Sequence, residues 1–137
     1  MKNNTARNQR ILIVEDDMLL SLVEERLVLK LGYSVAGKAV SGEEAIEKTK
    51  NLNPDLILMD ISLRGELDGV ETMKVIREFS SVPVIYLSGN SDKLSIERAK
   101  KTNFVDYLIK PVTENDLNTP IAKAFKLSSD LQLSHAV

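Results

Sequence analysis

Five short apolar runs alternate with longer segments of helical period along this chain. The runs cover residues 10–15, 34–39, 55–60, 82–88 and 104–109, and the helical segments lie near 17–31, 42–52, 68–79, 91–101 and 113–127. Runs such as LILM and VIYL are continuously apolar, as expected of parallel strands that are buried on both faces. The alternation therefore predicts an α/β fold with a five-stranded parallel sheet and helices on both of its faces.

The simplest arrangement of five such units is a flavodoxin-like sheet with strand order 2-1-3-4-5. The length of 137 residues fits one domain of this kind, with its own buried core. We expect the domain at 10–127, between a polar N-terminal extension at 1–9 and a C-terminal tail at 128–137.

Composition narrows the possible chemistry. The chain has no cysteine, which excludes disulfides and thiolate metal sites. A formal net charge of −2 leaves no cationic excess for binding nucleic acid directly. The polar N-terminus contains neither a signal-peptide core nor a membrane span, so we expect a cytoplasmic protein with no membrane partner.

Acids and one lysine stand at the ends of the predicted strands. Glu15, Asp16 and Asp17 follow ILIV, Asp60 ends LILM, and Lys110 follows FVDYLI. The carboxyl ends of parallel strands meet at one edge of the sheet, where ligand sites form. Any one of these acids could be an ordinary surface residue. Two unneutralised carboxylates about 4 Å apart, however, repel by roughly 4 kcal/mol at an effective dielectric near 20. The convergence of these acids therefore favours a cation site. Asp17 is better interpreted as the N-cap of the first helix than as a ligand.

Five sequence blocks carry a family resemblance. ILIVEDD at 11–17, DLILMD at 55–60, LDGVE at 67–71, VPVIYLSG at 82–89 and FVDYLIKP at 104–111 resemble the receiver domains of two-component response regulators. The blocks keep the family's order and spacing from about residue 10 to residue 127. The resemblance implies Mg²⁺-dependent phosphorylation of an aspartate by a sensor histidine kinase or a histidine phosphotransfer protein.

The resemblance also implies the metal ligands. Asp60 would be both the phosphoacceptor and a ligand of Mg²⁺. Asp16 would bind the metal directly, and Glu15 would bind it through water or orient that water. Ser62, two positions after the acceptor, would supply its backbone carbonyl. A few protein oxygens suffice, because Mg²⁺ keeps several of its waters.

Three further residues would serve catalysis and switching. By resemblance, Lys110 would pair with the phosphoryl oxygens and Ser88 would donate a hydrogen bond to them. Tyr107 matches the family's switch aromatic, although composition alone favours a core aromatic. The switch would remodel the fourth helix, fifth strand and fifth helix, a surface that also allows a homodimer. The Lys110–Pro111 bond is expected to be cis.

The chain departs from the family pattern in three places. Asp68 lies eight positions after Asp60, one more than expected, and Arg64 stands where proline is usual, so this loop is expected to be longer or more mobile. Serine followed by glycine at 88–89 is a milder change that keeps the hydroxyl. Pro120 falls inside the fifth helix, which is expected to kink, begin later or break near 116–119.

The sequence favours a stand-alone receiver that acts as a phosphorylation switch or relay, not a turnover enzyme, with its output passing to an unidentified downstream protein. A dinucleotide-binding domain would need a glycine-rich first turn, which is acidic here. A Mg²⁺-dependent aspartyl phosphatase usually has its nucleophile after the first strand and a second acid two positions later, and Glu15 with Asp17 is a poor match. A phosphorylation-silent receiver-like adaptor is the third possibility, and the full set of acids, serine and lysine argues against it.

Overall fold

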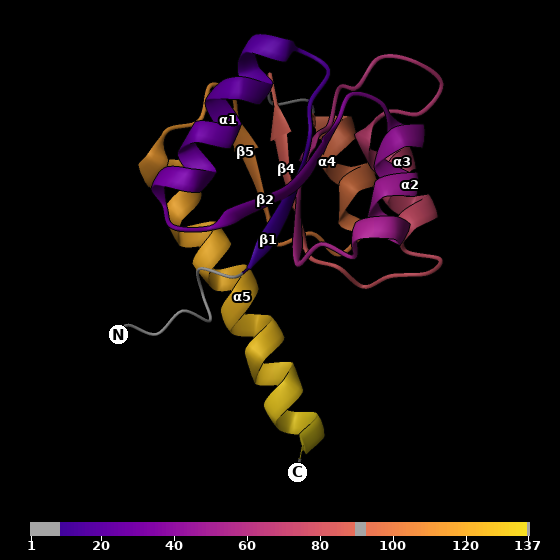
Figure 1. The fold of residues 1–137 in the computed structure, drawn as a ribbon. Coiled ribbons are helices and arrows are strands. Elements are labelled where there is room, and N and C mark those ends of the chain that lie inside the picture. The colour runs from indigo at the N-terminus through magenta and orange to yellow at the C-terminus, as the bar shows by residue number, and fades with distance from the viewer. Residues whose placement is uncertain (1–8, 90–92, 137) are drawn as a thin grey trace.

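A computed structural model of the protein describes residues 9–89 and 93–136. Strands and helices alternate along the chain from β1 to α5 (Figure 1). The strands are β1 (Arg10–Val14), β2 (Ser34–Ala39), β3 (Leu56–Asp60), β4 (Val84–Ser88) and β5 (Asp106–Ile109). The helices are α1 (Met18–Lys30), α2 (Gly42–Leu52), α3 (Gly69–Ile76), α4 (Lys93–Lys100) and α5 (Glu114–Ala136).

The five strands form one parallel sheet in the order β2-β1-β3-β4-β5, which confirms the predicted α/β, flavodoxin-like topology. In its register, Val14 pairs with Met59 and Ser88 pairs with Ile109. The residues that follow β1 and β5 therefore reach the same edge of the sheet as Asp60.

Helices cover both faces of the sheet, with α1 and α5 on one side and α2, α3 and α4 on the other (Figure 1). Successive strand residues point to opposite faces, so the central strands supply two separate cores. Leu12, Ile57 and Tyr86 belong to the core under α2, α3 and α4, whereas Ile13, Leu58 and Ile85 belong to the core under α1 and α5. All six side chains are fully buried, as the continuous apolar runs predict.

Helix ends follow the sequence signals. The side chain of Asp17 caps α1 by accepting a hydrogen bond from the Leu20 amide at 3.0 Å, as predicted. Asp68 is the N-cap of α3 and forms a capping box with Glu71, in which each side chain accepts a hydrogen bond from the other residue's backbone amide. The predicted start of the fourth helix at residue 91 and the extension at residues 1–8 lie outside the described residues.

Helix α5 excludes two of the three alternatives expected from Pro120, a late start and a break, and the expected kink stays a prediction. It begins at Glu114 and continues through Pro120 to Ala136, so it neither starts late nor breaks near 116–119. Proline removes the hydrogen bond that would reach the Asp116 carbonyl, but the buried side chains of Leu117 and Ile121 anchor the helix on both sides of it. The backbone stays helical through most of the expected tail and projects beyond the sheet (Figure 1). Among the described residues, no helix is both long enough and apolar enough to cross a membrane.

Candidate functional site

Three carboxylates meet where β1 and β3 end. Glu15 directly follows β1, Asp16 is the next residue, and Asp60 is the last residue of β3. One oxygen from each lies within 4.8 Å of the others. Glu15 and Asp60 are only 1% and 2% exposed. The fold thus brings together the three predicted side-chain ligands as buried or half-buried acids.

Gly69 shapes the backbone under Asp60. A Cβ at this position would lie 2.4 Å from the Asp60 carbonyl oxygen and 2.8 Å from the Cα of Ile61. Only glycine lets α3 begin this close to the end of β3. The Gly69 amide donates to the Ile61 carbonyl at 3.1 Å, and the Ile61 amide donates to Leu87 in β4 at 2.8 Å. The chain is therefore held on both sides just after Asp60.

Lys110 reaches the acids from the end of β5. Its Nζ lies 3.2 Å from Glu15 Oε1 and 3.4 Å from Asp60 Oδ1. Burial lowers the pKa of Lys110, but the carboxylates of Asp60 and Glu15 outweigh burial and leave that pKa raised, so the amine stays charged. The Lys110–Pro111 peptide bond is cis, as predicted.

Asp60 is buried beside the carboxylates of Glu15 and Asp16, and Lys110 is its ion-pair partner. Burial raises the pKa of Asp60 to about 6, and the charge of Glu15 adds to this rise. The Ser62 amide, which donates to Asp60 Oδ1 at 2.9 Å, and the charge of Lys110 act in the opposite direction. A hard divalent cation fits such a set, because it would supply the missing charge to oxygen ligands. The metal-binding role of the Ser62 carbonyl stays a prediction.

Ser88 lies one strand away from Asp60. It is the last residue of β4, is 1% exposed, and its carbonyl accepts from the Lys110 amide at 2.6 Å. This backbone hydrogen bond therefore links the end of β4, which lies next to Asp60, to Lys110 at the end of β5. This place suits the predicted hydrogen bond to a phosphoryl group, which stays a prediction.

Asp16 is paired with the loop that follows β3. Arg64 donates to Asp16 Oδ2 twice, from its backbone amide and from Nε, each at 3.1 Å. Burial raises the pKa of Asp16, but the bonds and charge of Arg64 outweigh burial and lower it. The loop with arginine in place of the usual proline is thus tethered to a predicted metal ligand, and it turns at Gly65, which has a φ of 107°.

Glu24 was missed by the sequence reasoning. It lies on α1, is 3% exposed, and its carboxyl group is close enough to Glu15 for the two groups to influence each other's charge. Burial raises the pKa of Glu24 to about 9, and the Glu15 carboxylate adds to the rise. Among the described residues, its Oε1 has no hydrogen-bond partner. Its spacing from the buried residues Ser21 and Val28 is the sequence signal that could have placed it on the buried face of α1.

Tyr107 already packs toward the interior. Its ring centroid lies 6.5 Å from that of Tyr86 and 6.3 Å from that of Phe104. Its hydroxyl is buried without a hydrogen-bond partner in the described part of the chain. Tyr107 therefore packs against the core, as composition predicts, and this position is also compatible with the predicted switch role.

Comparisons with known proteins agree with this geometry. The family model described as "Response regulator receiver domain" matches residues 11–122. The chemotaxis protein CheY of Thermotoga maritima is 34% identical over 104 residues, which are 75% of this chain and 86% of CheY. The probable C4-dicarboxylate response regulator DctR of Halalkalibacterium halodurans is 34% identical over 125 residues, which are 90% of this chain but 54% of the regulator.

A solved structure agrees as well. The signal receiver domain of a modulated diguanylate cyclase from Desulfovibrio desulfuricans G20 superposes with a TM-score of 0.83 at 36% identity, covering 89% of this chain and 97% of that domain. The chain belongs to the response regulator receiver domain family of two-component systems.

Proposed function

We propose that the protein is a phosphoacceptor switch in which Asp60 receives a phosphoryl group from a histidine of a partner kinase or phosphotransfer protein. The observation that carries this proposal is the meeting of Asp60 with Glu15, Asp16 and Lys110 at one edge of the sheet. Family membership supports the same assignment.

The chemistry starts with an Asp60 carboxylate oxygen as the nucleophile. It attacks the phosphorus of a phosphohistidine, an O–P bond forms as the N–P bond breaks, and the histidine nitrogen keeps the electron pair. Lys110, 3.4 Å from Asp60 Oδ1, is placed to pair with the transferred oxygens. Ser88 is proposed to donate a hydrogen bond to the same group.

The carboxylates of Glu15, Asp16 and Asp60, with the carbonyl of Ser62, are the proposed ligands of Mg²⁺. When bound, the ion would offset the negative charge shared by Asp60 and the incoming phosphoryl group. The three oxygens within 4.8 Å suit this hard cation.

The output is proposed to pass through α4, β5 and α5 to a downstream protein, in the cytoplasm and without turnover of an external substrate. A contact between elements supports this route: Arg98 of α4 lies 3.1 Å from Asp68, the N-cap of α3. A shift of the loop between Asp60 and α3 would therefore reach α4. A homodimer through the same surface stays a prediction.

The test is incubation with a small phosphodonor such as phosphoramidate and Mg²⁺, followed by intact mass measurement. We expect one phosphoryl adduct on the parent protein and none on Asp60→Asn. The matched control is Asp55→Asn, at the opposite end of β3, where the side chain accepts from the Arg10 amide and asparagine can do the same. This variant should be phosphorylated like the parent.

Other outcomes distinguish the rival functions. Steady release of phosphate without an adduct would favour an aspartyl phosphatase. No reaction in the parent would favour a silent adaptor. A labile phosphoryl group on Asp60→Asn would show that the acceptor is another residue.

A further inference from the structure

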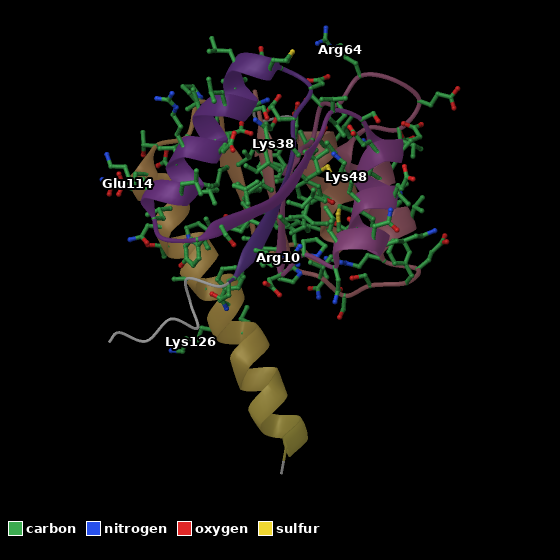
Figure 2. All side chains as sticks on the ribbon, viewed as in Figure 1. Arg10, Lys38, Lys48, Arg64, Glu114 and Lys126 are labelled. Atoms are coloured by element: carbon green, nitrogen blue, oxygen red, sulfur yellow. The ribbon has the colours of Figure 1, made fainter. Side chains whose placement is uncertain are left out.

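Arg64 is the one residue of the loop 61–68 whose side chain pairs with a predicted metal ligand in the described part of the chain. Figure 2 shows it on the loop that follows β3, at the edge of the molecule. Its Nε lies 3.1 Å from Asp16 Oδ2, and its side chain is 83% exposed. The guanidinium thus stands between the acid site and solvent.

The two donors from Arg64 converge on a single oxygen of Asp16. The backbone amide would remain in any variant, so only the side chain adds a full positive charge. A cation entering between Asp16 and Asp60 would have to displace that charge from Oδ2 or bind beside it. In either case, like charges would repel.

We propose that Arg64 is an internal counter-cation of the site, which pairs with Asp16 while no metal is bound and weakens the binding of divalent cations. This inference rests on the proposed function, because it assumes that Asp16 is a Mg²⁺ ligand. An exposed ion pair has a modest strength, equivalent to roughly a two- to fivefold change in binding. Arg64 would thus tune the metal concentration at which the acceptor is ready for transfer.

The test compares Mg²⁺ affinity in the parent, Arg64→Ala and Arg64→Gln at about 0.15 M salt. Glutamine keeps an N–H donor at about the position of Arg64 Nε without the charge, so it separates the effect of charge from that of the hydrogen bond. Arg26→Ala is the matched control, because Arg26 is exposed on α1 and lies roughly 13 Å along the helix from Asp17, beyond a Debye length of about 8 Å. Affinity is read from amide NMR shifts of residues 15–17 and 60–63 during a Mg²⁺ titration.

We expect both Arg64 variants to bind Mg²⁺ roughly two- to fivefold more tightly than the parent, and Arg26→Ala to bind like the parent. Equal or weaker binding by Arg64→Ala and Arg64→Gln, with a parent that does bind, would overturn the role of Arg64 and leave the proposed function standing. Absence of saturable shifts in every variant, together with no phosphorylation of the parent, would overturn the proposed function and this inference with it.

Discussion

Three acids and one base share the space behind the ends of β1 and β3. Glu15, Glu24 and Asp60 are each at most 3% exposed, and Lys110 is the base that contacts two of them. Burial disfavours the ionised form of a carboxyl group unless nearby positive charges and hydrogen-bond donors offset its negative charge. The raised pKa values of Asp60, about 6, and Glu24, about 9, follow from this imbalance.

Asp60→Asn should stabilise the metal-free protein near neutral pH by roughly 1–3 kcal/mol. Because the folded-state pKa of Asp60 is raised from 3.8 to about 6, its contribution is fully favourable below pH 3.8 and is lost as pH rises through 6. The gain from the substitution should therefore grow between those pH values. Urea unfolding of both proteins from pH 4 to 7 in a chelator measures it, and a gain that is independent of pH would contradict the assignment.

Glu24→Leu should also stabilise the protein, by about 1–3 kcal/mol at neutral pH, because it removes a buried carboxyl group with an unpaired oxygen. The raised pKa means that the parent loses stability as pH climbs toward 9, and the leucine variant should lose less. Thermal unfolding across that range is the measurement. Glu25→Leu, at the neighbouring position where Glu25 pairs with Lys38 and is only half-buried, is the control that should bring no such gain.

At the scale of elements, the neighbouring strands β4 and β5 are in contact through the rings of Tyr86 and Tyr107. Tyr86 is fully buried, and its hydroxyl lies 2.7 Å from Thr102 Oγ1. The Tyr107 ring packs against the Tyr86 ring. Its buried hydroxyl, in contrast, has no hydrogen-bond partner among the described residues. The cost of that hydroxyl would be relieved in a conformation where it reaches water or a partner, which suits an element that changes position.

Tyr107→Phe and Tyr86→Phe form a matched pair with opposite expected signs. The first removes an unpaired hydroxyl and should be neutral or stabilising by up to about 1 kcal/mol, whereas the second leaves the Thr102 hydroxyl without Tyr86 and should destabilise by about 1 kcal/mol. Denaturant unfolding of both variants measures the difference. Equal losses would mean that the Tyr107 hydroxyl has a partner in solution.

At the scale of the whole molecule, the acid site joins segments from opposite ends of the chain. Lys110 and Glu15 are 95 positions apart, and Arg64 and Asp16 are 48 positions apart. The unfolded chain cannot hold these groups together, so a cation that binds the site binds only the folded state. Occupancy of the site is therefore coupled to global unfolding.

Mg²⁺ should raise the melting temperature of the parent, with a gain of about 2.7 kcal/mol when the free ion is 100 times its dissociation constant. Asp60→Asn should gain much less, because it loses a proposed ligand. Glu47→Gln, which removes an exposed acid on α2, should respond like the parent. Scanning calorimetry with and without Mg²⁺ tests this, and an equal gain in all three proteins would place the bound ion elsewhere.

The sequence by itself determined the sheet, its strand order and the edge where the acids meet. Apolar runs, helix caps such as Asp17 and strand-end residues such as Asp60 are local signals, because each depends on neighbours along the chain. Periodicity then leaves few topologies for five such units. Element ends were less well predicted, and β5 begins at Asp106 instead of residue 104.

Only the tertiary structure decided the burial of Glu24, the Arg64–Asp16 pair and the inward packing of Tyr107. Each depends on contacts between segments that are distant in sequence, and a local signal such as the spacing of Glu24 from Ser21 and Val28 indicates a buried helix face without specifying what packs against it. Helix α5 shows the same physics, since burial of Leu117 and Ile121 outweighs the local preference of Pro120 to end a helix. Local preferences are worth about 1–3 kcal/mol, which a few buried side chains can exceed.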